Sequence, residues 1–213
     1  LHGPVRHGER REELLMKDGI DLSGKRVGLV MTGSFCTFQK VFDQLEGLKQ
    51  SGCQLYPILS DKAYELDTRF FTAEQVRDTL KKATGREIWH TLQQVEPIGP
   101  KKLLDLLIVA PCTGNTLAKM AQGGVDTPAS MAVKSQLRNG RPVLLAISTN
   151  DGLGVSARNI AQLLTMRHIY FVPYGQDDPE GKPASLVAHM ELLAESAEAA
   201  LQGKQIQPIL RSY

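Results

Sequence analysis

The chain has 213 residues, of which 42% are hydrophobic and 23% charged, which is enough for one globular domain with a substantial core. Its formal net charge of +2 comes from interspersed basic and acidic residues, so the pattern of a DNA- or RNA-binding protein is missing. No apolar run approaches the roughly 20 residues of a membrane span, and the three cysteines lack the spacing of a metal site. These features predict a soluble cytoplasmic protein without a resident metal.

The first residues are rich in His, Arg and Glu and contain no apolar signal segment. We expect residues 1–23 to be a peripheral or poorly ordered extension, or the remnant of a tag. Residues 24–213 are expected to form the folded domain.

Strand and helix patterns alternate in the first half of this domain. Residues 26–31 form an apolar strand pattern, and residues 37–49 follow as an amphipathic helix. A second strand pattern spans residues 53–59. Thr72 with Gln75 then predicts a capping box at the start of the next helix.

The same alternation continues in the second half. Residues 103–110 are almost all apolar, as in a parallel strand covered on both faces, and this strand is expected to break at Pro111 into a small polar loop that opens a helix. A helix over 128–138 has Thr127 as its cap. Further strands are predicted at 142–147 and 169–173.

An amphipathic helix over residues 186–201 is expected to close the chain. The alternation predicts a single α/β domain with a doubly wound, mostly parallel sheet and helices on both faces, of the Rossmann-like or flavodoxin-like class.

Small polar residues follow each predicted strand, and the carboxyl ends of parallel strands form the ligand-binding edge of such sheets. In any single loop these residues can simply cap helices and make turns, but their recurrence after four strands favours a binding site. The predicted cofactor-binding residues are Gly33, Ser34, Ser60, Thr113, Gly114, Asn115, Thr116, Ser148 and Asn150. Neither the three spaced glycines of a dinucleotide site nor a P-loop Gly-Lys pair is present in the first of these loops.

Residues 110–119 read Ala-Pro-x-Thr-x-Asn-Thr-x-x-Lys and lead into Gly123-Gly124-Val125-Asp126. This segment resembles the flavoproteins of the homo-oligomeric flavin-containing cysteine decarboxylase family. The resemblance implies that the loops hold FMN, with Gly33 and Ser34 near the phosphate and Ser60 near the phosphate and ribityl chain. It also implies that Thr113, Asn115 and Thr116 meet the isoalloxazine ring.

Two features of the decarboxylases are missing. Pro97 stands where an ungapped alignment places their histidine, and residues 147–154 replace their Pro-Ala-Met-Asn segment. Decarboxylation of peptidyl cysteine is therefore not expected.

Within this group the chain is similar to the family of dipicolinate synthase B subunits, through residues 67–70, 96–101, 174–177 and 203–208. This resemblance implies a homo-oligomeric protein that works with a separate A subunit, which binds NADP or NAD. The pair would oxidise dihydrodipicolinate to dipicolinate in the mother cell of a sporulating bacterium.

That reaction needs a hydride acceptor, a base, and cations for two carboxylates. Arg69, Lys134 and Arg138 are the candidate cations, and Arg69 is preferred because the other two lie on a helix as ordinary surface charges would. Asp151 is the candidate base, or else a cap for the following turn. Cys112 is expected to be a small buried residue without a nucleophilic role.

Two alternative functions remain open from the sequence. One is a non-catalytic protein that keeps the flavin fold in order to dock or stabilise the A subunit. The other, which Pro97 disfavours, is a flavin-dependent decarboxylase.

Overall fold

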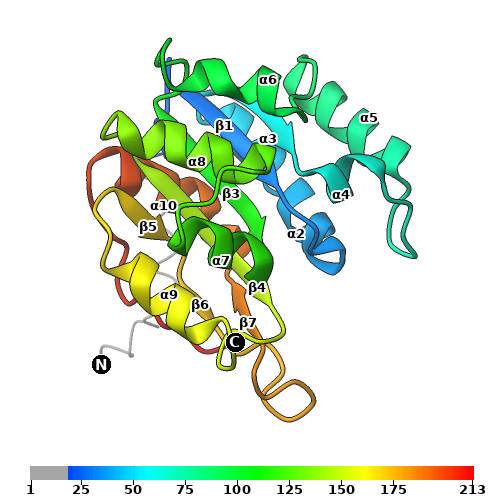
Figure 1. The fold of residues 1–213 in the computed structure, drawn as a ribbon, viewed down its shortest axis with the longest axis vertical. Helices are drawn as coiled ribbons and strands as arrows, with labels where there is room; N and C mark the ends of the chain where they lie inside the picture. Colours follow the sequence, from blue (N-terminus) through cyan, green and yellow to red (C-terminus); the bar gives the residue numbers. More distant parts are fainter. Residues whose placement is uncertain (1–18) are drawn as a thin grey trace, which may run out of the picture.

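The computed structural model describes residues 19–213, and a single sheet runs through the middle of this part of the chain (Figure 1). Its seven strands lie in the spatial order β2-β1-β3-β4-β7-β6, and β5 pairs with β4 beside β7. The strands are Arg26–Met31 (β1), Gln54–Leu59 (β2), Leu106–Cys112 (β3), Val143–Thr149 (β4), Ile169–Phe171 (β5), Tyr174–Gly175 (β6) and Leu186–Ala188 (β7).

Strands β1 to β5 pair in parallel, whereas β7 runs antiparallel to both β4 and β6. The first half of β4 pairs with β5, and its carboxyl end, Ser148 and Thr149, pairs with β7. The chain leaves β1 toward β2 and returns to β3 on the other side, so the order of strands reverses between β1 and β3. The predicted doubly wound, mostly parallel sheet is confirmed.

Helices cover both faces of the sheet (Figure 1). α8 contacts β2, β3 and β4, and α7 contacts α8 and α9 on that face, whereas α2 and α10 reach β3 from the other face. The α-helices are Phe38–Phe42 (α2), Leu45–Gln50 (α3), Asp61–Glu65 (α4), Ala73–Thr84 (α5), Leu92–Val95 (α6), Gly114–Ala121 (α7), Pro128–Arg138 (α8), Ala157–Leu164 (α9) and Leu193–Leu201 (α10). Short 3-10 helices span Phe35–Thr37 (η1), Glu96–Ile98 (η2) and Met190–Leu192 (η3).

The core lies along β3, every residue of which is buried. This explains the nearly continuous apolar sequence of the strand, because helices pack on both of its faces. The β1, β2 and β4 strands flank it with buried residues at most positions.

The expected break at Pro111 is wrong, because β3 continues through this residue to Cys112. The pairing of β3 with β4 shifts register between Val109 and Cys112, and such an irregularity accommodates a residue that has no N–H to donate. The Pro111 carbonyl still accepts a hydrogen bond from the backbone N–H of Thr32.

Two helix predictions need correction. The pattern over 37–49 is divided between η1, α2 and α3, although its apolar stripe is buried as expected. Residues 186–188 form β7 instead of the first turn of a helix, because their backbone pairs with β4 and β6, and α10 begins only at Leu193. Pairing between distant segments has overridden the local period.

The predicted extension, residues 1–23, lies mostly outside the described residues. Within the described part, Leu22 is only 1% exposed and its N–H donates to the Ser51 carbonyl, so the packed core begins before Gly24. None of the helices in residues 19–213 combines the length and apolar character that crossing a membrane requires.

Candidate functional site

The loops that follow β1, β3 and β4 meet at the carboxyl edge of the sheet. The reversal of strand order between β1 and β3 makes a crevice there, and open α/β sheets bind ligands at such a switch point. All nine predicted cofactor-binding residues line at least one of three adjoining pockets at this edge.

Thr32 joins the two strands that border the crevice. Its hydroxyl donates to the Pro111 carbonyl at 2.7 Å and accepts from the N–H of Thr113 at 3.1 Å. Both groups are backbone groups of the β3 end, and Thr32 is itself buried. The side chain therefore fixes the start of the Thr113 loop against the end of β1.

Thr113 caps helix α7. Its hydroxyl accepts from the N–H of Thr116 at 3.3 Å and lies 3.0 Å from the Thr116 hydroxyl. The cap leaves the first N–H groups of α7 directed toward the crevice, where the helix dipole favours negative charge. Asn115 lines two of the three pockets.

The Lys and Asp of the motif that suggested the family pair with each other. Lys119 Nζ donates to Asp126 Oδ2 at 2.5 Å, and the pKa of Asp126 is lowered, chiefly by this hydrogen bond. The pair joins α7 to the segment before α8. These two residues thus support the loop from outside the pockets.

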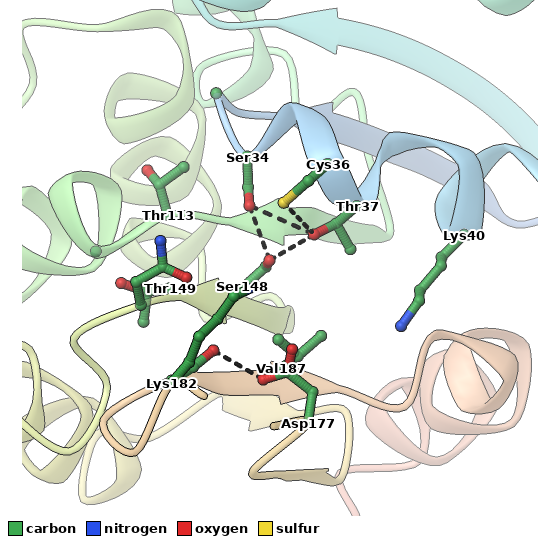
Figure 2. A pocket seen from close by; sticks show the side chains of 14 residues that line it. Ser34, Cys36, Thr37, Lys40, Thr113, Ser148, Thr149, Asp177, Lys182 and Val187 are labelled. Carbon is green, nitrogen blue, oxygen red and sulfur yellow. Dashed lines mark hydrogen bonds between the residues drawn. The ribbon is translucent and has the colours of Figure 1, made fainter. Parts of the chain in front are cut away.

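The first pocket, which we call the hairpin pocket, has a volume of about 320 Å³ and lies between the β1 loop and the segment joining β6 to β7. Figure 2 shows Ser34, Thr37 and Ser148 pointing toward one another within it. The Ser148 hydroxyl lies 2.8 Å from that of Ser34 and 2.6 Å from that of Thr37. Lys40 and Lys182 also line this pocket.

The second pocket, the Ser60 pocket, has a volume of about 200 Å³ and includes Gly33 and Thr113 in its lining. Ser60 caps α4, with its hydroxyl accepting from the N–H of Ala63 at 3.3 Å. Lys62 contributes a cation to the same lining. The Ser60 pocket and the hairpin pocket share Gly33 and Thr113, so they adjoin across the β1–β3 crevice.

The third pocket, the Asp151 pocket, has a volume of about 470 Å³ and is more open. Asp151 accepts hydrogen bonds from Thr149 Oγ1 at 2.5 Å and Ser156 Oγ at 2.7 Å, and these bonds lower its pKa. A Cβ on Gly114 would lie 2.7 Å from Ser156 Oγ and 3.0 Å from Asp151 Oδ1. The backbone at the start of α7 is therefore pressed against this hydrogen-bonded group.

The structure does not bring the predicted cations to these pockets. Arg69 is exposed in the α4–α5 connection, with its guanidinium 4.8 Å from the centre of the Phe70 ring. Lys134 is exposed on α8. Arg138 ends that helix, about 16 Å along it from Thr127 of the Ser60 pocket.

Cys112 is buried, and burial raises the pKa of its thiol well above the ordinary value. It therefore packs as a small apolar residue, as expected. His90 stacks on Tyr64 with ring centres 3.6 Å apart and stands outside the three pockets.

Sequence reasoning missed the polar residues that the hairpin adds. The pairing of β7 with β4 brings three residues to the lining of the hairpin pocket, Asp177, Lys182 and Ser185. No local sequence pattern predicts that pairing. Lys40 was also missed, although it follows Thr37 at a spacing of three, which places both on one side of a helical turn.

Comparison with known proteins defines the class of this chain. The model of the family described as "Flavoprotein" matches residues 17–199. The chain therefore belongs to the Flavoprotein family.

Within that family, the chain is 43% identical over 189 residues to the B subunit of dipicolinate synthase from Bacillus subtilis (strain 168), covering 89% of this chain and 94% of the relative. The crystal structure of the dipicolinate synthase B subunit from Bacillus halodurans C has 43% identity and a TM-score of 0.83, and the match covers 90% of this chain and 98% of that one. The structure of the FMN-dependent cysteine decarboxylase SpaF is similar in fold, with a TM-score of 0.61 at 19% identity over 85% of this chain and 99% of that chain. The predicted resemblance to dipicolinate synthase B subunits is confirmed.

Proposed function

We propose that this chain binds FMN in the β1–β3 crevice and acts with an A subunit in oxidising dihydrodipicolinate to dipicolinate. In this proposal the A subunit carries NADP or NAD, and the pair works in the mother cell of a sporulating bacterium. The identity of 43% to a dipicolinate synthase B subunit over most of the chain supports the choice of reaction.

The observation that carries the proposal is the convergence of four strand-end loops at the switch point. Nine residues chosen from the sequence line adjoining pockets there, although they come from four separate segments of the chain. In sheets with this strand order, FMN binds between β1 and β3. The name of SpaF, which shares the fold, also describes an FMN-dependent protein.

The residues present fit a flavin mononucleotide. Gly33 leaves a space at the junction of the two pockets, because a Cβ there would be 3.6 Å from Phe35 and 3.9 Å from Lys62. Hydroxyl and amide groups line the rest of the crevice and suit a ribityl chain and a ring edge. Lys62 adds a positive charge near Ser60, where the phosphate is proposed to lie.

Aromatising the dihydropyridine ring removes one hydride and one proton. Bound FMN supplies a two-electron acceptor for the hydride, and the proton passes to a base or to water. The residues of this chain would hold the reacting ring and exclude water at the crevice. The two electrons would be taken up either by FMN held in this chain or directly by the nucleotide of the A subunit.

The two residues proposed as catalytic, Asp151 and Arg69, differ in their position relative to the pockets. Asp151 lines its pocket, but the two hydroxyl groups that donate to it make its carboxylate a weaker base and favour a positioning role. Arg69 lies outside the three pockets of its own chain. It would therefore meet substrate only in a pocket of another chain, which agrees with the proposed homo-oligomer.

Titration of the purified chain with FMN tests the cofactor assignment, with the flavin absorption band and fluorescence as readouts. We expect saturable binding that Asn115→Ala weakens. A chain that takes up no FMN would favour a non-catalytic role in which the protein docks the A subunit.

Dipicolinate formation by both subunits together tests the reaction. We expect Asn115→Ala and Arg69→Ala in this chain to lower turnover, and either protein without the other to be inactive. Undiminished turnover by both variants would show that Asn115 and Arg69 are not part of the active site.

A further inference from the structure

The hairpin pocket carries two lysines that the cofactor assignment does not use. We propose that Lys40 and Lys182 form the subsite that holds the two carboxylates of a small dicarboxylic ring acid. This inference rests on the proposed function and names the residues that would bind its substrate and product.

The two lysines come from separate elements. Lys40 lies on α2 and its side chain extends down from that helix in Figure 2, while Lys182 lies on the segment that joins β6 to β7; both line the pocket. Among residues 19–213, neither lysine forms an ion pair within 4.0 Å. Lys40 Nζ instead lies 5.6 Å from the centre of the Tyr213 ring, a contact that helps to orient it at the pocket rim.

The floor of the pocket supplies hydroxyl groups rather than further charge. Thr37 and Ser148 are each 4% exposed, and both belong to the cluster that includes Ser34. Each hydroxyl carries one proton and two acceptor lone pairs, so the cluster can turn a donor toward an anion without losing all of its internal bonds. Buried donors of this kind are suited to a carboxylate oxygen.

Asp177 is the third charged group on the lining. Its Oδ1 accepts from Ser185 Oγ at 2.8 Å, so part of its hydrogen-bonding capacity is already used. Because two lysines and one carboxylate line the pocket, its charged groups carry a net positive charge, which favours binding of a dianion. FMN bound at Gly33 and Thr113 would take part of the pocket's volume of about 320 Å³, and the acid would lie on the side formed by α2 and the β6–β7 segment.

Each carboxylate of the ligand would meet one lysine, so the two lysines should contribute separately. The experiment uses calorimetric titration of pyridine-2,6-dicarboxylate into the FMN-loaded chain, with Lys40→Gln, Lys182→Gln and the double variant. Each single change should weaken binding about fivefold, the range for a partly exposed ion pair. In the double variant, the affinity for the monocarboxylate picolinate should fall by a smaller factor than the affinity for the dicarboxylate.

Lys82→Gln is the matched control, because Lys82 is an exposed lysine on α5 outside the pocket. It should leave dicarboxylate binding unchanged. Equal binding by the wild type and both pocket variants overturns the inference, as does a wild type that does not bind the dicarboxylate at all.

The flavin phosphate is the other anion that the two lysines could bind. The same variants distinguish phosphate binding from dicarboxylate binding at these lysines. Loss of FMN affinity in Lys40→Gln with riboflavin affinity unchanged would place the phosphate there and overturn the inference. If the wild type binds no FMN, the dicarboxylate is titrated into the chain alone. An affinity that depends on both lysines there means that the subsite stands and the cofactor part of the proposed function fails.

Discussion

A methyl group at Gly33 would extend into the space shared by the Ser60 pocket and the hairpin pocket. The contacts that its Cβ would make, at 3.6 Å and 3.9 Å, are ordinary van der Waals distances, so the fold accepts the change. We expect Gly33→Ala to keep its unfolding free energy within about 1 kcal/mol of the wild type. FMN affinity should fall about tenfold or more because the crevice is narrowed.

Gly47→Ala on α3 is the control for this change, since nothing lies within 4 Å of the added Cβ. Fluorescence titration with FMN and urea unfolding measure the two effects. Equal FMN affinity of Gly33→Ala and Gly47→Ala would mean that the cofactor does not bind in the β1–β3 crevice.

Asp151 contributes stability that depends on pH. Its pKa is lowered from 3.8 by the hydroxyls of Thr149 and Ser156, so the folded state favours the carboxylate. The stabilisation is present above pH 3.8 and is lost as the pH falls through the lowered pKa. We expect Asp151→Asn to cost about 1–2 kcal/mol near neutral pH.

Urea unfolding of the wild type and Asp151→Asn at neutral and at acid pH measures this difference, which should shrink in acid. Asp78→Asn, at a position on α5 away from the pockets, provides the control. A difference that stays constant with pH would mean that the charge of Asp151 has no part in holding the start of α7.

At the scale of an element, Thr113 shows how one side chain serves both a helix and a site. Removing its hydroxyl in Thr113→Ala leaves the Thr116 N–H without its cap. We expect a loss of about 1 kcal/mol in unfolding free energy and weaker FMN binding, whereas Thr113→Ser should retain both. Urea unfolding and FMN titration of the two variants provide the test, and equal behaviour of Ala and Ser would contradict the role of the cap.

The β6–β7 hairpin is the element that sequence patterns described least well. Residues 186–188 fit the apolar period of a helix, but their backbone pairs with Ser148 and Thr149 of β4. This pairing brings Lys182 and Asp177 to the hairpin pocket. The proposed substrate subsite therefore depends on a contact between segments that lie far apart in the chain.

For the whole molecule, Leu22 marks where the core begins. Its side chain is 1% exposed and belongs to the main hydrophobic cluster, although it precedes the expected domain start at Gly24. We expect Leu22→Ala to cost about 2–5 kcal/mol in unfolding free energy. Leu164→Ala, at a residue that is 43% exposed, should cost much less in the same urea unfolding measurement, and similar losses for the two variants would contradict the packing of Leu22.

The sequence by itself determined the alternation of strands and helices, the caps at Thr72 and Thr127, and the polar strand ends. These features are set by local periodicity and by hydrogen bonds between residues three apart, which can be recognised along the chain. The parallel topology then brings the strand ends to one edge. This is why the pocket residues were predictable before their distances were known.

Only the tertiary structure decided which charged groups reach that edge. Arg69 was favoured for its chemistry but lies on an exposed connection, while Lys40 and Lys182 line the hairpin pocket. The position of a charge in space depends on how distant segments pair, and β7 pairs with β4 through backbone groups that all sequences share. The sequence therefore located the edge where the three pockets lie, and the fold selected the cations that line them.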